Sequence, residues 1–120
     1  MENKEAIPEL DPVLMNPKRF LIASILYMLG PRTISSIQKT LKISWGPLYT
    51  HIKRMEEENY IKIKKILTPL GPRTIIELTD KGIEAYEELL RRLRKIIEVM
   101  KPHIAKELRD LEKHVRSTKA

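Results

Sequence analysis

The chain has 120 residues, 42% of them hydrophobic and 32% charged, with a formal net charge of +7. This length allows one domain with a hydrophobic core, or a small domain with an accessory helix. The lack of cysteine excludes disulfides, zinc ribbons and thiol catalysis, and it fits a reducing cytoplasm. No apolar run is long enough to span a membrane, and the acidic N-terminus does not resemble a signal peptide. Abundant Ile, Lys and Glu with almost no Gln indicate a thermophilic source.

The positive charge is concentrated in the middle of the chain. Residues 1–15 have a net charge of −3, residues 16–76 of +8 and residues 77–120 of +2. A central region this basic favours a polyanionic partner, with nucleic acid first and an acidic membrane surface second. The alternative is a well-solvated charged surface without such a partner.

Two helices are predicted before residue 44. Asn16 followed by Pro17 is a helix start, and Gly30-Pro31 ends that helix. Its residues are apolar nearly all round, so we expect it to be buried. Asp11, also followed by proline, carries the same start signal. A shorter helix with Thr33 as its N-cap follows, and its apolar face consists of Ile34, Ile37 and Leu41.

The stretch Ser44–Glu58 is predicted to be an amphipathic helix although it contains Gly46 and Pro47. With Ser44 as the N-cap, Pro47 takes the third helical position, where its missing N–H would lack an intrahelical partner anyway. At about 100° per residue, one side of this helix is apolar. That side collects Leu48, Ile52 and Met55, with Asn59 at its end. The opposite side is small, hydroxylated and basic, with Gly46, Thr50 and Lys53.

A β-hairpin and a long helix complete the predicted elements. Residues 60–67 alternate as a half-buried strand, residues 68–73 form a turn rich in Pro and Gly, and residues 74–78 form a second strand. Thr79 caps the terminal helix. Pro102 lies within that helix, and we expect a kink or two consecutive helices there. The apolar residues recur as a heptad seam made of Ile83, Tyr86, Leu90, Leu93, Ile97, Met100, Ile104, Leu108 and Leu111.

The order of these elements is that of a winged helix-turn-helix domain, and two patterns at Leu48–Ile61 and Pro72–Gly82 are specific enough to suggest a family. Over about residues 10–90 the chain resembles compact winged-helix transcriptional regulators related to the ArsR and MarR groups, with PadR-like features. The expected fold class is therefore mainly α (α+β), with a two-stranded β-wing and a long C-terminal helix. The resemblance implies a homodimer that binds specific duplex DNA, usually for repression.

The resemblance also divides the chain and assigns its parts. It implies an N-terminal arm (1–15), a DNA-binding domain (16–79) and a C-terminal helical dimerisation segment (80–120). Ser44–Glu58 corresponds to the recognition helix, Lys64–Arg73 to the wing, and the heptad seam to the dimer contact. Asn59 stands where these regulators often have glycine, and it is the next best residue for a left-handed helix end.

The residue chemistry supports the same surface. A recognition helix approaches the major groove with its N-terminus, and a glycine there lets the backbone and DNA come close. Hydroxyl, amide and cationic side chains reach phosphates and base edges. The expected DNA contacts are Ser44, Gly46, Pro47, Tyr49, Thr50, Lys53, Arg54, Lys64, Lys65, Arg73, Lys18 and Arg19. Trp45 is expected to anchor the start of the helix, and His51 to be packed or hydrogen-bonded.

Other functions are less well supported by the sequence. An enzyme would need a phosphate-binding loop or a catalytic set that the chain lacks, and His103 and His114 have no partners at metal-ligand spacing, so no cofactor or metal is expected. The alternatives that remain are a winged-helix module for protein–protein assembly and a nonspecific nucleic-acid-binding protein. The operator, the choice between repressor and activator, and a small-molecule effector stay open.

Overall fold

The computed structural model describes the backbone of residues 8–119 and the side chains as far as residue 117, so the N-terminal part of the expected arm lies outside the described residues. The described residues fall into two units, one of residues 10–89 and one that includes residues 90–119. These limits differ from the expected boundaries after residues 15 and 79. The elements in order are α1 (Pro17–Leu29), β1 (Arg32–Thr33), α2 (Ile34–Leu41), α3 (Trp45–Glu57), β2 (Ile61–Thr68), β3 (Gly71–Leu78) and α4 (Asp80–Lys119).

The predicted starts of α1 and α2 are confirmed by their capping bonds. The Asn16 side chain accepts hydrogen bonds from the backbone N–H groups of Lys18 and Arg19 at 3.0 and 3.1 Å. The Thr33 hydroxyl accepts from the N–H of Ser36 at 3.1 Å. Each cap satisfies backbone donors that have no partner within the helix. The Gly30 backbone, with φ of +78°, ends α1 as expected.

Residues 11–15 belong to the core of the 10–89 unit, although they were expected to form part of the arm. Val13 and Leu14 are 1% and 0% exposed. Asp11 folds this segment into a turn instead of a helix, because its Oδ1 accepts the N–H of Val13 at 2.8 Å and that of Leu14 at 3.0 Å. Its Oδ2 accepts the hydroxyl of Tyr60. Burial and this hydrogen bond to Asp11 raise the pKa of Tyr60.

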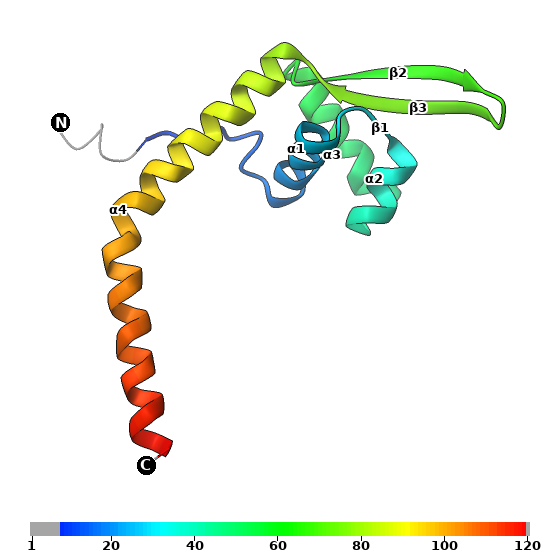
Figure 1. The fold of residues 1–120 in the computed structure, drawn as a ribbon. Coiled ribbons are helices and arrows are strands. Elements are labelled where there is room, and N and C mark those ends of the chain that lie inside the picture. Colours follow the sequence, from blue (N-terminus) through cyan, green and yellow to red (C-terminus); the bar gives the residue numbers. More distant parts are fainter. Residues whose placement is uncertain (1–7, 120) are drawn as a thin grey trace. The chain divides into compact units, whose positions relative to one another are not determined.

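The sheet has the strand order β1-β3-β2, and both pairings are antiparallel. β1 was not predicted from the sequence, because two residues are too few to show the alternating hydrophobic pattern of a strand. β2 and β3 pair from Ile61↔Leu78 to Thr68↔Gly71, so the connecting loop is only Pro69 and Leu70. The six-residue turn expected at 68–73 is therefore too long. Figure 1 shows the hairpin running outward beyond the helices of this unit.

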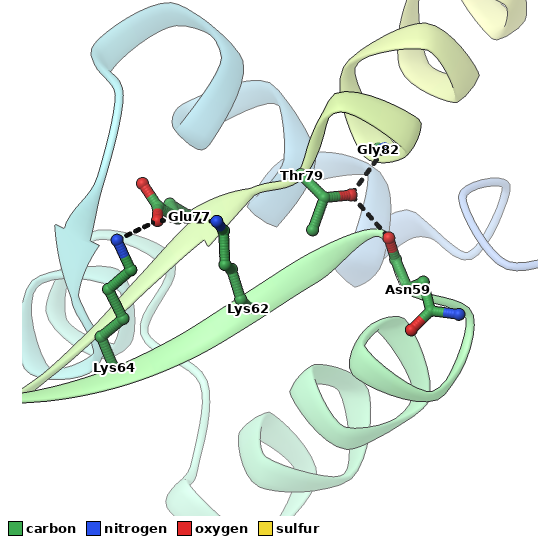
Figure 2. Close-up of polar contacts among 6 residues, drawn as sticks. All are labelled: Asn59, Lys62, Lys64, Glu77, Thr79 and Gly82. Atoms are coloured by element: carbon green, nitrogen blue, oxygen red, sulfur yellow. Dashed lines mark hydrogen bonds and ion pairs between the residues drawn. The ribbon is translucent and has the colours of Figure 1, made fainter.

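The end of α3 is fastened to the start of α4 (Figure 2). Asn59 has a left-handed φ of +63°, and the N–H groups of Asn59 and Tyr60 close the helix end on the carbonyls of Glu56 and Met55 at 2.8 and 2.9 Å. The Thr79 hydroxyl donates to the Asn59 carbonyl at 2.5 Å and accepts the N–H of Gly82 at 3.0 Å. Thr79 is thus the predicted cap of α4, and it also holds the preceding helix.

Gly82 is required at this junction by a close backbone approach. A Cβ atom at this position would lie 2.0 Å from the carbonyl oxygen of Tyr60 and 3.1 Å from Leu78 Cδ2. Any larger residue would have to push α4 away from the end of α3. The glycine of the Pro72–Gly82 pattern is therefore explained by packing.

α4 is one continuous helix of 40 residues that contains Pro102. Of the two outcomes expected at Pro102, a kink or two consecutive helices, the second is wrong. A proline inside a helix removes one backbone hydrogen bond, and the remaining bonds on either side keep the helix intact here.

Candidate nucleic-acid interface

α3 buries one side and exposes the other, as its sequence predicts. Leu48, Ile52 and Met55 are at most 2% exposed. Ser44 takes the N-cap backbone conformation (φ −62°, ψ 150°) but makes no side-chain capping bond. The first turn therefore keeps its positive dipole end without a capping hydroxyl from Ser44. Pro47 occupies the third helical position, as predicted.

The exposed side of α3 presents an aromatic pair followed by hydroxyl and cationic groups. Trp45 and Tyr49 are 43% and 54% exposed, and their rings stack with centroids 5.8 Å apart. The Thr50 hydroxyl donates to the Gly46 carbonyl at 3.1 Å. Lys53 Nζ lies 3.4 Å from Glu56 Oε1, an exposed pair of the kind that contributes little to stability. Lys53 and Arg54 are exposed.

Gly46 adds open space at the front of this side. A Cβ atom built on Gly46 meets no atom within 4 Å outside its chain neighbours and its own helix backbone. The following Pro47 restricts the residue before it, because the proline ring clashes with a Cβ in the helical conformation. Glycine therefore lets the chain stay helical before Pro47 and leaves this end of the helix slim.

Arg19, a predicted DNA contact, makes two hydrogen bonds within the fold. Its Nε donates to the carbonyl of Val13 at 2.5 Å, and its Nη1 lies 3.2 Å from His51 Nδ1. Since the guanidinium can only donate, His51 Nδ1 accepts this bond. The pair ties α1 to the inner edge of α3. Burial and the charge of Arg54 lower the pKa of Arg19. Arg19 therefore supports the helix from behind, whereas Lys18 is exposed.

His51 is hydrogen-bonded, as expected. Burial, followed by the positive charges of Arg19 and Lys18, lowers its pKa. The neutral form of the imidazole is thus favoured on this basic side of the domain.

A depression connects α3 with the hairpin. It has a volume of about 570 Å³, and its lining includes Tyr49, Thr50 and Lys53 of α3 together with Ile63 of β2. We call it the α3–β2 groove. Arg54 also lines it, and so do the acidic residues Glu56 and Glu57 at its far end. Four of the predicted DNA contacts therefore lie along one concave surface.

The register of the hairpin separates the predicted wing contacts into two faces. Cross-strand partners share a face and neighbours along a strand alternate. Lys65, opposite Thr74, thus lies on the face of Ile63, which lines the α3–β2 groove. Lys64, opposite Ile75, and Arg73, opposite Ile66, lie on the other face. Residues 64–73 were expected to form one contact surface. Because neighbouring residues of a strand alternate between its faces, the predicted contacts lie on two faces.

Glu77 forms ion pairs with two lysines of the hairpin that were not predicted from the sequence. Its Oε1 lies 2.7 Å from Lys64 Nζ and 3.8 Å from Lys62 Nζ, as Figure 2 shows. The hydrogen bond from Lys64 lowers the pKa of Glu77, and the nearby lysine charges add to this. Lys64 is therefore partly neutralised within the protein. The register Lys62↔Glu77 was the signal that would have revealed the pair. Arg73 Nη1 donates to the carbonyl of Pro72 at 2.9 Å.

The predicted heptad seam divides at residue 89. Tyr86 is 5% exposed and packs on Phe20 and Tyr27, and its hydroxyl lies 2.7 Å from the Ser24 hydroxyl. The prediction that Tyr86 contacts a second copy of the chain is therefore wrong. Leu89, which the seam did not include, is 1% exposed. Ile83 is half-buried. Beyond this point Leu93 is half-buried. The other apolar side chains of the seam are 38–58% exposed, namely Leu90, Ile97, Met100, Ile104, Leu108 and Leu111.

Two further properties bear on possible ligands. Among the residues that the structure describes, no group of three or more His, Asp or Glu side chains is placed to hold a metal ion. Within the same residues, no helix combines the length and apolar character required to cross a membrane.

Comparison with known proteins places this surface in context. Residues 19–97 match the family described as a winged helix DNA-binding domain. A transcriptional regulator homologue from Pyrococcus horikoshii is 33% identical with a TM-score of 0.73, covering 83% of this chain and 98% of that one. A PadR family transcription regulator from Clostridium difficile is 28% identical with a TM-score of 0.61, covering 70% and 94%. AbfR in its overoxidized form bound to DNA is 25% identical with a TM-score of 0.55, covering 80% and 70%.

Proposed function

The chain belongs to the winged helix DNA-binding family, as a DNA-binding transcriptional regulator and not an enzyme, and from this premise we propose that it acts as a homodimeric repressor on a defined duplex sequence. In this proposal α3 enters the major groove and the hairpin contacts the flanking backbone or minor groove. The proposed location is the cytoplasm, where the target DNA lies and where the lack of cysteine fits the reducing conditions.

The observation that carries the proposal is the α3–β2 groove, where the hydroxyl groups of Tyr49 and Thr50 and the cationic groups of Lys53 and Arg54 line one concave surface. The slim start of α3 at Gly46 precedes these residues on the same helix. The N-terminal dipole of α3 favours phosphate, and Gly46 permits a close approach. Tyr49, Thr50 and Lys53 line this groove. In other helix-turn-helix proteins, residues toward the N-terminus of the recognition helix contact base edges. Cationic side chains there bind phosphate or guanine.

The remaining predicted contacts receive different roles. Lys65 extends the groove along the hairpin, and Lys18 adds a phosphate contact beside α1. Arg73 and Lys64 reach DNA from the other face of the hairpin, so they contact the duplex only where the wing enters a groove. Arg19 acts indirectly by holding His51 and α3 in place.

The homodimer is proposed from the exposed apolar stripe of α4. Six side chains between Leu90 and Leu111 recur at heptad spacing and stay 38–58% exposed. Such a stripe is stabilised when a second copy covers it. Two-fold symmetry then places the two α3 helices about 34–36 Å apart on a pseudo-palindromic operator. A truncation after Gly82 would remove Tyr86 and Leu89 from the core, so point substitutions on α4 test the dimer more cleanly.

The test is the selection of bound sequences from a random duplex pool. We expect one motif for the full-length protein, a weaker and less restricted motif for Lys53→Ala, and a change confined to the flanks for Arg73→Ala. Lys106→Ala is the matched control, since it removes the same charge from α4 and should leave the motif unchanged. Recovery of no motif, or a motif that neither groove nor wing variant alters, would favour the protein–protein assembly module or the nonspecific binder.

A further inference from the structure

The tip of the hairpin carries three exposed apolar side chains, Ile66, Leu67 and Leu70. Leu67 and Leu70 are 85% and 84% exposed, and Ile66 is 40% exposed. We call these three residues the apolar wing tip. Ile66 and Leu67 are neighbours on β2 and lie on opposite faces, so one sheet face cannot cover both. Figure 1 shows this end of the hairpin beyond the helices of its unit.

The apolar wing tip is held in one conformation by its own turn. The Thr68 hydroxyl donates to the Gly71 carbonyl at 2.6 Å and accepts the N–H of Leu70 at 3.2 Å. Gly71 has a φ of +112°, which allows the chain to reverse after only two loop residues. A tip that is ordered before binding loses little conformational freedom when it is buried.

The surroundings of the apolar wing tip are cationic on both faces. Between Tyr60 and Glu77 the sequence has four Lys or Arg residues and no acidic residue. Lys65 lies on one face of the hairpin and Arg73 on the other. An apolar tip that is flanked by cations fits a polyanion with a narrow space between two rows of negative charge. The minor groove of DNA has this form, since phosphates line both sides of a space about 6 Å wide.

Apolar side chains at such a point have a known physical use on DNA. Leucine or isoleucine inserted between two base pairs partly unstacks them and bends the duplex. The cost is lowest at flexible pyrimidine–purine steps, so an insertion favours those sequences without any hydrogen bond to a base. The hairpin adjoins the α3–β2 groove, which directs its tip to DNA on the flank of the sequence that α3 contacts.

We propose that the apolar wing tip inserts into the minor groove beside the α3 site and kinks the duplex there. This inference rests on the proposed function and adds an indirect, shape-based component to operator choice. The operator then carries a flexible step on each flank, at a position without polar contacts to the protein.

The experiment uses the full-length protein with its selected operator. Bending is measured by energy transfer between dyes at the duplex ends, and unstacking by 2-aminopurine placed at successive flanking steps. We expect the wild-type protein to bend the duplex and to brighten 2-aminopurine at one step per flank. The Leu67→Ser/Leu70→Ser variant should lose both signals and bind about ten-fold more weakly, with the same salt dependence because phosphate contacts are kept.

The control is Met28→Ser, which removes another apolar side chain that is 70% exposed and should leave bending unchanged. Equal bending by wild type and the double variant, or a straight duplex with both, would overturn the inference. So would binding to phosphatidylserine vesicles that depends on Leu67 and Leu70 while DNA bending does not. A double variant that still selects the operator but leaves it straight supports the inference, whereas a wild-type protein that selects no sequence refutes the proposed function as well.

Discussion

Replacing Gly46 with alanine changes two local energies of opposite sign in the free protein. Alanine stabilises a helical position by about 0.5–1 kcal/mol relative to glycine. The ring of Pro47 opposes this gain, because it disfavours the helical conformation for a preceding residue that has a Cβ. No other atom lies within 4 Å of that Cβ. The free energy of unfolding should therefore stay within about 1 kcal/mol of the wild-type value.

The same methyl group acts differently when DNA is bound. The proposed approach brings the start of α3 against the duplex, and a displacement of about 1 Å would lengthen hydrogen bonds there beyond their useful range. We expect Gly46→Ala to weaken operator binding at least about ten-fold, which corresponds to about 1.4 kcal/mol. Gly46→Leu should weaken it further. Fluorescence anisotropy of labelled operator measures the affinity, and thermal unfolding measures the stability.

Gly82→Ala is the matched control, because the same substitution there meets the Tyr60 carbonyl at 2.0 Å. Overpacking of this kind costs about 1–3 kcal/mol. For a domain of 60–100 residues this lowers the melting temperature by about 4–8 °C for each kcal/mol. The two glycines should thus separate, with Gly82 affecting stability and Gly46 affecting DNA binding. A Gly46→Ala variant that binds the operator normally, or one that unfolds as readily as Gly82→Ala, would refute the reasoning.

Four other predictions concern α4, Glu77 and His51. Ile104→Glu, placed on the exposed stripe of α4, should give monomers in sedimentation velocity, while Lys106→Glu should leave the dimer intact; a dimeric Ile104→Glu protein would contradict the seam. Glu77→Gln should raise affinity for random duplex DNA and steepen its salt dependence, since Lys64 is freed for phosphate; unchanged binding would show that Lys64 stays off the DNA. In the wild type, the stability contributed by the Lys64–Glu77 pair is complete above the ordinary carboxyl pKa and is lost as the pH falls through the lowered pKa of Glu77. The Glu77→Gln variant should therefore lose less stability on acidification. Because the pKa of His51 is lowered, its contribution to the free energy of unfolding is complete above about pH 6.5 and declines as the pH falls below that value. The free energy of unfolding of His51→Gln, measured by urea titration, should lack this decline.

Local features of the sequence predicted the elements well. The caps Asn16 and Thr33, the burial of Leu48, Ile52 and Met55, and the left-handed end at Asn59 all followed from rules that act within a few residues. Contacts between distant residues were not predicted. No local pattern indicates that the Arg19 guanidinium bonds the Val13 carbonyl and His51. Tyr86 matched a heptad position, yet α1 covers it.

The sequence by itself determined the winged-helix order, the basic middle of the chain and the amphipathic character of α3, because charge and hydrophobic period are local properties. Only the tertiary structure decided which cations lie on the same face. Strand register assigned Lys65 to the face of the α3–β2 groove and Lys64 to the face of Glu77. The tertiary structure also separated Gly46, which is open, from Gly82, which lies against the Tyr60 carbonyl. The sequence alone does not distinguish these two glycines. They differ in the atoms that lie next to each Cα in the folded chain.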